Sequence, residues 1–347
     1  MTTSVALIGA TGHGNWHRLA IAALGDRVRL VALGDVRPVE DADVPVYADH
    51  RELLDRHAPE IVVVCTPPHT HLSIARDVLA AGADLLLEKP PVLSLDEHRA
   101  LLAAVSASGR ALQVGFQALG SPTLAALPAR VGTVTSVALA GAWWRGDAYW
   151  KRSPWAGRSS VGGRPTMDGA LCNPLAHGLM QALAIAGVRP PWTLELERFR
   201  TRDIEVEDTA ALRLTVPGGP VVTAAVTLCS EEFIPGDLTV TGTRGTATVV
   251  YPQDRLDGDV LPGRVSLLAN LLDHRADGTP LLVPLERTEP FTALAASVMA
   301  ADPPVALPRE RLAPHPDGDG LVIPGIAHHV RAAAARGALF SEIGALP

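Results

Sequence analysis

The chain has 347 residues, 47% of them hydrophobic and 19% charged, which is typical of a compact globular protein and allows two domains. Its formal net charge of -7 argues against nucleic acid or an anionic membrane surface as a partner. No apolar run is long enough to span a membrane, and the opening residues carry no basic segment or cleavage site of a secretory signal.

The three cysteines are far apart in the sequence, at Cys65, Cys172 and Cys229. An odd number of scattered cysteines is typical of reduced thiols rather than of a disulfide framework. We therefore expect a cytoplasmic protein. No run of His, Cys and carboxylate residues has ligand spacing, so the sequence indicates no metal site.

The first third of the chain alternates apolar runs of strand length with helical patterns. The expected strands are residues 4–10, 28–35, 60–67, 84–89 and 111–116. The expected helices are residues 16–24, 49–57, 71–82 and 95–107. Nearly continuous apolar strands separated by helices predict a parallel sheet covered on both faces, here an α/β Rossmann domain over residues 1–118.

After about residue 120 the strands alternate apolar residues with small or polar ones. They are expected at residues 132–144, 192–201, 208–218, 220–230, 236–243 and 245–252, with helices near 175–187 and 325–337 and an irregular loop over 302–325. This pattern predicts an α+β domain over residues 119–347, with a large open, mostly antiparallel sheet that has one uncovered face. Such a face exposes more apolar surface than a monomer usually does, so we expect a homodimer through the C-terminal sheet.

A glycine-rich turn joins the first expected strand to the first helix. Its candidate cofactor-binding residues are Gly9, Thr11, Gly12, His13 and Gly14. In such a turn, backbone amides and the helix N-terminus face a pyrophosphate; a plain tight turn is the alternative.

Asp35 ends the second strand, where a carboxylate can bind the ribose diol of NAD and repel the 2′-phosphate of NADP. An ordinary turn residue is the alternative there. Arg37 can pair with that phosphate, so NADP stays possible.

Two further loops follow strands at the same expected edge of the sheet. The segment Thr66-Pro67 with His71 follows one strand, and Glu88-Lys89 ends the next. His71 either contacts the cofactor or is an ordinary helix residue. Lys89 is one of only two lysines in the chain, the other being Lys151. A lysine can stabilise a developing alkoxide and can also lose its proton, which arginine effectively cannot.

The second domain supplies the candidate substrate-binding residues. Four of the six tryptophans fall within residues 143–158, and clustered aromatics beside charged residues suit a sugar, or else a subunit interface or a small core. The candidates are Trp150, Trp155, Arg158, Asp168, Asn173 and His177. His177 is a candidate acid/base, or else a core histidine, and Asn173 lies four residues before it, on the same helix face if the helix begins near Pro174.

These segments together resemble the Gfo/Idh/MocA family, that of glucose–fructose oxidoreductase and inositol dehydrogenase. The matching residues are Gly9, Gly14 and His17 in the glycine turn, Thr66, Pro67 and His71, the Glu88-Lys89-Pro90 signature, and Gly169, Leu171 and His177. The chain departs from the family pattern at Thr11, Asp168 and Asn173, and in lacking the arginine usual after "VGFQ".

The resemblance implies an NAD(P)-dependent oxidoreductase acting on a hydroxyl or carbonyl of a sugar-like or cyclitol-like polyol. It implies Lys89, His177 and Asn173 as catalytic residues and a homodimer or homotetramer. Two alternatives remain: a dinucleotide-binding sensor without turnover, and NAD-assisted glycoside cleavage.

Overall fold

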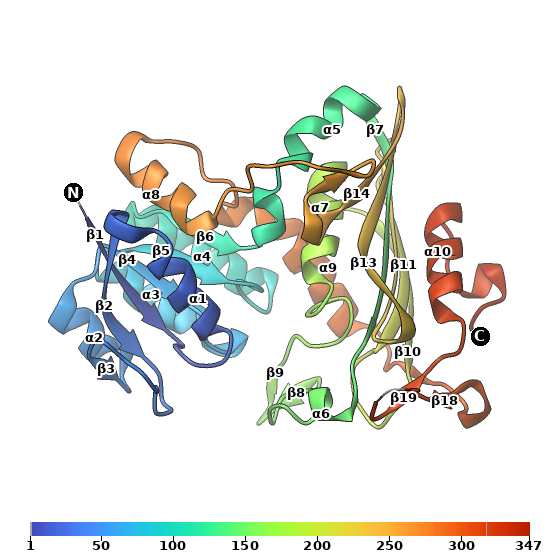
Figure 1. The fold of residues 1–347 in the computed structure, drawn as a ribbon, viewed down its shortest axis with the longest axis horizontal. Helices are drawn as coiled ribbons and strands as arrows, with labels where there is room; N and C mark the ends of the chain where they lie inside the picture. The colour runs from blue at the N-terminus through green and yellow to red at the C-terminus, as the bar shows by residue number, and fades with distance from the viewer. Residues whose placement is uncertain (1, 317) are drawn as a thin grey trace. The chain divides into compact units, whose positions relative to one another are not determined.

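The computed structural model describes residues 2–316 and 318–347, and the chain divides into two compact units (Figure 1). The first unit runs to Gly120 and also takes in Val265–Thr292. The second unit comprises Ser121–Arg264 and Ala293–Pro347. The first unit is thus discontinuous in sequence, unlike the contiguous division at residue 118 that the sequence predicted.

The first unit is built on a six-stranded parallel sheet in the order β3-β2-β1-β4-β5-β6. Its strands are β1 (Thr3–Ile8), β2 (Val28–Gly34), β3 (Val46–Tyr47), β4 (Ile61–Val64), β5 (Asp84–Glu88) and β6 (Leu112–Gly115). This confirms the predicted parallel Rossmann sheet. The strand order reverses between β1 and β4, and ligands of such sheets bind beyond the carboxyl ends of the strands at this point.

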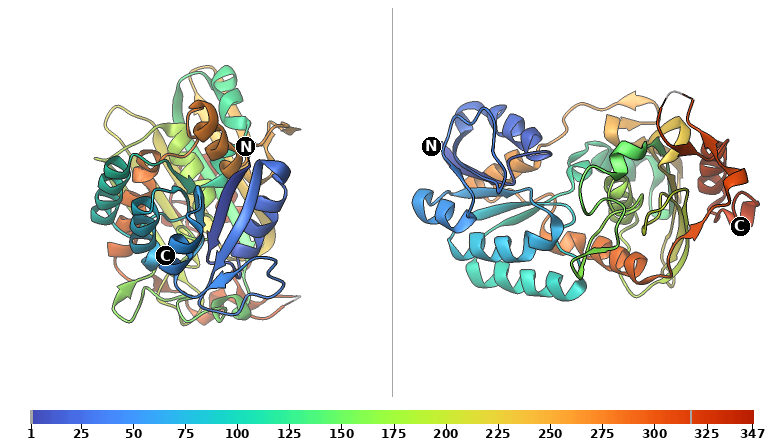
Figure 2. Two further views of the ribbon diagram at one scale, coloured as in Figure 1. Left: turned by 90° about the vertical axis from the view of Figure 1, so that its left-hand side faces the viewer. Right: turned by 90° about the horizontal axis from the view of Figure 1, so that it is seen from below.

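Helices lie on both faces of this sheet, as the right-hand view of Figure 2 shows. They are α1 (Gly14–Ala22), α2 (His50–His57), α3 (His71–Ala80) and α4 (Leu95–Ser108). The start of α4 is fixed by Ser94, whose hydroxyl accepts a hydrogen bond from the Glu97 amide at 3.1 Å. These four helices fall close to their predicted positions.

The returning segment is held in the first unit by a buried amide network. It contains α8 (Leu267–Asp277), a helix that was not predicted from the sequence. The fully buried Gln113 side chain of β6 donates to the Leu267 carbonyl at 2.6 Å and accepts from the Val283 amide at 2.9 Å. Because an unpaired buried amide is costly, these bonds tie the segment to β6.

The second unit contains a nine-stranded mixed sheet in the order β16-β15-β14-β13-β7-β12-β11-β10-β17. Its longer strands are β7 (Val134–Trp144), β10 (Thr193–Arg200), β11 (Thr209–Thr215), β12 (Val221–Thr227), β13 (Cys229–Gly242) and β14 (Gly245–Val250), and the short ones are β15 (Arg255–Leu256), β16 (Asp259–Val260) and β17 (Val305–Ala306). Only the β7–β12 and β10–β17 pairs of this sheet are parallel. The predicted mostly antiparallel sheet is confirmed.

The remaining elements of the second unit are short strands and helices. Two small hairpins pair β8 (Ser160–Val161) with β9 (Arg164–Pro165) and β18 (Ala313–Pro314) with β19 (Leu321–Val322). The helices are α5 (Thr123–Val131), α6 (Asp147–Trp150), α7 (Ala176–Ala186) and α10 (Ile326–Arg336), and α9 (Glu289–Ala300) crosses the division between the units.

Helices cover both faces of the nine-stranded sheet. Helix α7 packs against β7, β12 and β13 on one face, and α10 packs on the same strands from the other (Figure 1). Alanines line the strand side of the α10 contact: Ala138, Ala140, Ala142, Ala211 and Ala225. Because small side chains let a helix approach closely, Val330 and Ala333 of α10 are fully buried there. The expectation of an uncovered face is therefore incorrect for the strands that α10 contacts.

No helix within residues 2–316 and 318–347 is both long enough and apolar enough to cross a membrane.

Candidate active site

The glycine turn between β1 and α1 requires glycine at two positions. Gly9 has φ of 87°, and a Cβ there would lie 2.3 Å from the Cys65 carbonyl oxygen. A Cβ on Gly14 would lie 2.0 Å from the Gly9 carbonyl oxygen. Thr11, Gly12 and His13 form the turn between them, so the backbone here has the compact form that a pyrophosphate site needs.

Asp35 lies just beyond β2 and is hydrogen-bonded to the glycine turn. Its Oδ2 accepts from the amide and the hydroxyl of Thr11, at 2.9 Å and 2.8 Å. Its Oδ1 accepts from the Arg37 amide at 2.9 Å, and the Arg37 guanidinium donates to the Thr11 hydroxyl. Burial would raise the pKa of Asp35, but these hydrogen bonds outweigh it and hold the pKa below its usual value. Asp35 is therefore an anion at neutral pH.

His71 joins the loop after β4 to the loop after β5. It is fully buried at the start of α3, and its ring nitrogens lie 2.8 Å from the Thr66 carbonyl oxygen and 2.8 Å from that of Pro90. This placement favours a positioning role for His71, since its ring holds two cofactor-edge loops together rather than facing solvent.

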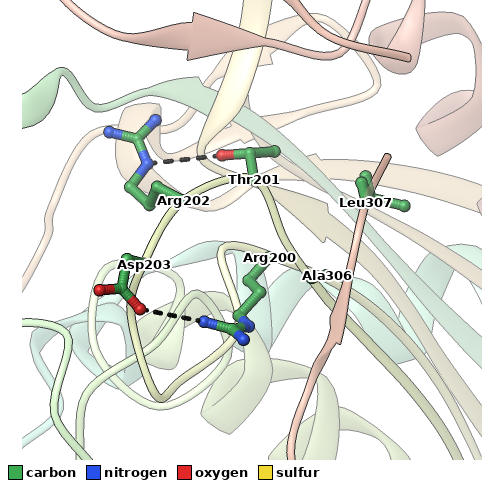
Figure 3. Close-up of a pocket in the computed structure, with 6 residues that line it drawn as sticks. All are labelled: Arg200, Thr201, Arg202, Asp203, Ala306 and Leu307. Carbon is green, nitrogen blue, oxygen red and sulfur yellow. Dashed lines mark hydrogen bonds and ion pairs between the residues drawn. The ribbon is translucent and has the colours of Figure 1, made fainter. Parts of the chain in front are cut away.

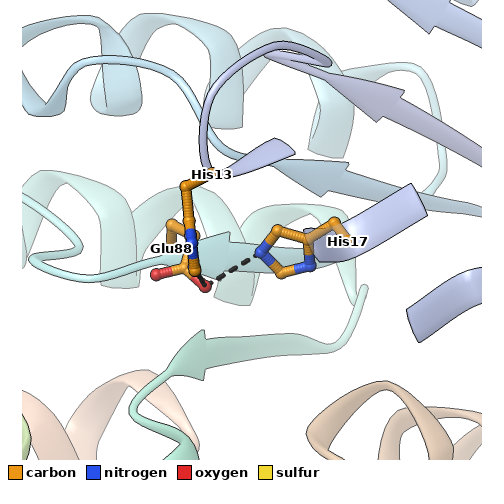
Figure 4. Close-up of side chains that lie close together, drawn as sticks. All are labelled: His13, His17 and Glu88. Atoms are coloured by element: carbon orange, nitrogen blue, oxygen red, sulfur yellow. Dashed lines mark hydrogen bonds and ion pairs between the residues drawn. The ribbon is translucent and has the colours of Figure 1, made fainter. Parts of the chain in front are cut away.

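The carboxylate of Glu88, the last residue of β5, is buried and bonded on several sides. Its Oε1 lies 3.0 Å from His17 Nε2 and accepts from Gln117 Nε2 at 2.8 Å, and its Oε2 accepts from the Lys89 amide at 3.0 Å. His13 Nε2 lies 3.8 Å from the same Oε1 (Figure 4). Gln117 was not among the predicted site residues, and its hydrogen bond to Glu88 reveals its place in the site.

Lys89 directly follows β5 at this edge and is half-buried. Its positive charge acts on the nearby Cys65. Burial and then the charge of Glu88 raise the pKa of the Cys65 thiol, while the positive charge of Lys89 opposes that rise. The first unit thus brings together, at the carboxyl ends of β1, β2, β4 and β5, all of its predicted cofactor residues.

In the second unit, Asp168 organises the loop that precedes α7. Its buried carboxylate accepts from Arg152 Nη2 at 3.1 Å, from the Gly157 amide at 2.8 Å and from Asn173 Nδ2 at 2.9 Å. A carboxylate with three donors is well satisfied, so these bonds give Asp168 a structural role in the free protein.

Asn173 and His177 flank the start of α7, and both are half-buried. The helix begins at Ala176, so His177 lies in its first turn and Asn173 lies before it, where its carbonyl accepts from the Ala176 amide at 3.3 Å. The Asn173 side-chain amide points to Asp168, a partner that its spacing from His177 did not indicate.

Three of the candidate substrate-binding residues, two tryptophans and an arginine, differ in exposure. The Trp150 ring is buried and packs beside Gly157 and Ile204, which is a core position. Trp155 is half-buried, with the Arg152 guanidinium 4.6 Å from its ring centroid. Arg158 is exposed and pairs with Glu205 at 2.9 Å. Trp155 and Arg158 therefore remain the accessible members of this group.

A shallow pocket of about 280 Å³ lies elsewhere in the second unit, at the turn after β10 and beside β17 (Figure 3). Arg200 and Asp203 in its lining form an ion pair at 3.5 Å, and Arg202 donates to Thr201 at 3.4 Å. None of the predicted site residues lines this pocket, so it adds nothing to the candidate active site.

Residues 3–116 match the family model described as "Oxidoreductase family, NAD-binding Rossmann fold", under the name Gfo/Idh/MocA. Residues 3–116 are therefore similar to the NAD-binding domain of this oxidoreductase family. The glycine turn, Asp35 and the Glu88-Lys89 strand end all lie within this matching segment.

Curated relatives match over part of their length. Inositol 2-dehydrogenase of Rhizobium meliloti is 32% identical over 149 residues, which are 40% of this chain and 45% of that protein. Inositol 2-dehydrogenase of Burkholderia multivorans is 30% identical over 125 residues, 33% of this chain and 37% of that protein. The chain thus spans less than half of the length of these relatives.

Solved structures of other proteins show the same fold over most of the chain. The WlbA dehydrogenase from Bordetella pertussis, solved with NADH and UDP-GlcNAcA, has a TM-score of 0.74 at 22% identity and covers 86% of this chain and 95% of its own. A putative myo-inositol dehydrogenase from Sinorhizobium meliloti has a TM-score of 0.67 at 19% identity, covering 86% and 98%. At these identities the likeness establishes the fold of both units.

Proposed function

We propose that this protein is an NAD(P)-dependent oxidoreductase that transfers a hydride between the nicotinamide and a hydroxyl or carbonyl carbon of a sugar-like or cyclitol-like polyol. The observation that carries the proposal is the strand edge of the first unit, where the glycine turn, an ionised Asp35 and Lys89 come together. Inositol and sugar-nucleotide dehydrogenases among the relatives support the substrate class.

The residues of the first unit fit the dinucleotide. The amides of the turn at Thr11, Gly12 and His13 would hold the pyrophosphate, and Asp35 would accept from the adenosine ribose. Thr66, Pro67 and His71 would shape the loop beside it. The bound nicotinamide supplies hydride acceptance and donation, and the remaining chemistry falls to side chains.

Proton transfer requires a group that exchanges a proton near neutral pH, and His177 is our candidate for it. The Lys89 ammonium would stabilise the developing alkoxide oxygen. The Asn173 side-chain amide already donates to Asp168, so its oxygen is the atom that would accept from His177 and orient the ring. Trp155 and Arg158 would contact the polyol.

The test is a panel of polyols and sugars followed by nicotinamide absorbance, with Lys89→Arg, Lys89→Ala and His177→Ala. Each variant should lose roughly 10²-fold or more in turnover while NAD affinity stays near wild type. The matched control is Lys151→Arg, which changes the other, exposed lysine.

A Lys89→Arg variant as active as wild type would overturn the role given to Lys89. A panel that gives no turnover, together with tight NAD binding, would favour a non-catalytic sensor. Cleaved product without net nicotinamide reduction would identify NAD-assisted glycoside cleavage.

Oligomerisation and a cytoplasmic location stay predictions. Because α10 covers the sheet face expected to pair, a homodimer or homotetramer through the C-terminal sheet would have to include α10 in the interface. Light scattering checks this against the 36.4 kDa of one chain.

A further inference from the structure

Three side chains with metal-ligating atoms converge beside the glycine turn. His13 belongs to the turn, His17 lies in the first turns of α1, and Glu88 ends β5. One ligand atom from each lies within 4.8 Å of the other two. Figure 4 shows both imidazole rings beside the Glu88 carboxylate.

The two histidines are positioned by helical geometry. His13 precedes α1 but has helical backbone angles, φ of -65° and ψ of -22°. Residues four apart on a helix lie on the same face, and a pair of histidines at this spacing is a common helical metal-binding arrangement. Glu88 approaches from 71 residues away in the sequence.

The distances suit a small divalent ion. Zinc binds imidazole nitrogen and carboxylate oxygen at roughly 2.0–2.2 Å, so tetrahedral ligands lie about 3.4 Å apart. The Glu88 Oε1 lies 3.0 Å from His17 Nε2 and 3.8 Å from His13 Nε2, on either side of that value. The three ligand atoms lie within 4.8 Å of one another, so the exposed His13 side chain would have to move by about 1 Å for all three to bind one ion.

The surroundings also suit an ion with one open position. Gln117 Nε2 and the Lys89 amide hold the Glu88 carboxylate in place, as outer partners of metal-ligating carboxylates do. His17 and Glu88 are buried, whereas the His13 side chain is 58% exposed, so water can occupy a fourth position. The His13 ring stacks on the Trp16 ring, with centroids 5.5 Å apart, and this contact holds its Nε2 on the side of Glu88.

We propose that His13, His17 and Glu88 form a binding site for a divalent transition-metal ion such as Zn²⁺. The ion would take the place of the proton between His17 Nε2 and Glu88 Oε1, and that proton would move to the Nδ1 atom of the His17 ring. This site does not depend on the proposed oxidoreductase function, because its ligands bind the ion without a cofactor or substrate.

The probe is Co²⁺, which substitutes for Zn²⁺ and has visible absorption that reports its ligands. The full chain, first treated with a chelator, is titrated with CoCl₂ and with ZnCl₂ as competitor. We expect one ion per chain, displaced by Zn²⁺. His13→Ala, a change at an exposed residue that should not disturb folding, should weaken Co²⁺ binding at least tenfold. The matched control His328→Ala removes an exposed histidine of α10 and should leave binding unchanged.

A second variant tests the position itself. His13→Cys should retain the ion and add a thiolate-to-Co²⁺ charge-transfer band in the near ultraviolet, because the thiolate would become a ligand. The proposal is overturned if wild type binds no Co²⁺, if His13→Ala binds as tightly as wild type, or if His328→Ala weakens binding equally.

Discussion

Thr11 donates two hydrogen bonds to Asp35, from its amide and from its hydroxyl, both to the same carboxylate oxygen. Thr11 stands where the family pattern has a glycine, and a glycine there would supply only the amide bond. The hydroxyl therefore gives the Asp35 carboxylate an additional fixed orientation before any cofactor binds. The Arg37 guanidinium also donates to this hydroxyl, so its charge is held near the carboxylate.

The choice of cofactor should depend on Asp35. We expect NAD to bind tenfold or more tightly than NADP, because the carboxylate repels a 2′-phosphate, and a misplaced charge readily costs about 1.4 kcal/mol. Asp35→Ala should remove this preference, as Arg37 would then be free to pair with the phosphate. Fluorescence titration with both dinucleotides measures the ratio, with Asp43→Ala at an exposed position as control. Tighter NADP binding to wild type would contradict the assignment.

The same carboxylate should contribute to stability in a pH-dependent manner. Because the folded-state pKa of Asp35 is lowered, its contribution is present above the unfolded pKa of about 3.9 and is lost as pH falls through the folded value. Asp35→Asn should lower the free energy of unfolding by about 1–3 kcal/mol at pH 7 and at pH 5, since it loses charge-assisted hydrogen bonds. Urea unfolding should show this deficit shrinking below pH 4. A deficit that is constant down to pH 2 would rule out the charge as its cause.

Asn173→Asp would restore the residue that the family often has, yet we expect it to be harmful here. The Asn173 amide lies 2.9 Å from the Asp168 carboxylate, so the change would place two carboxylates in contact and lose a hydrogen bond. The free energy of unfolding at pH 7 should fall by about 1–3 kcal/mol.

The double variant Asn173→Asp with Asp168→Asn should recover part of this loss, because donor and acceptor are exchanged. Urea unfolding of both singles and the double gives the coupling between the positions. If the losses in the free energy of unfolding of the two single variants simply add in the double variant, the contact between residues 168 and 173 does not contribute to stability.

Helix α10 should be required to keep the alanine-lined sheet face buried. Ala333→Asp would place a charge against this face, with an expected cost of about 3–5 kcal/mol, and should yield larger species in light scattering. The control Ala335→Asp makes the same change on the exposed side of the same helix. Equal effects of the two variants would contradict the burial described for α10.

Much of the fold could be predicted because its signals are local. The apolar runs of β4 and β5 and the serine cap of α4 are visible within a few residues of sequence. The helix α8 was missed because its serine cap, Ser266, follows a stretch without clear periodicity. Its membership of the first unit depends on Gln113, more than 150 residues earlier.

In the candidate site too, features encoded in a short motif could be predicted, whereas contacts between distant residues could not. The Glu88-Lys89 strand end was predictable from its motif, whereas the meeting of Glu88 with His13, His17 and Gln117 depends on the tertiary fold. The Asn173–Asp168 contact was likewise hidden, since the spacing of Asn173 from His177 suggested a different partner.

Helix α10 is synthesised after the sheet that it covers, and this order matters for the growing polypeptide. Every strand of the nine-stranded sheet is made before residue 326, so the sheet can assemble while its alanine-lined face still lacks its cover. Exposed apolar surface on a partly made chain favours aggregation and recruits chaperones. The yield of this protein in a cell should therefore depend on how well nascent chains are shielded during the interval between completion of the strands and docking of α10.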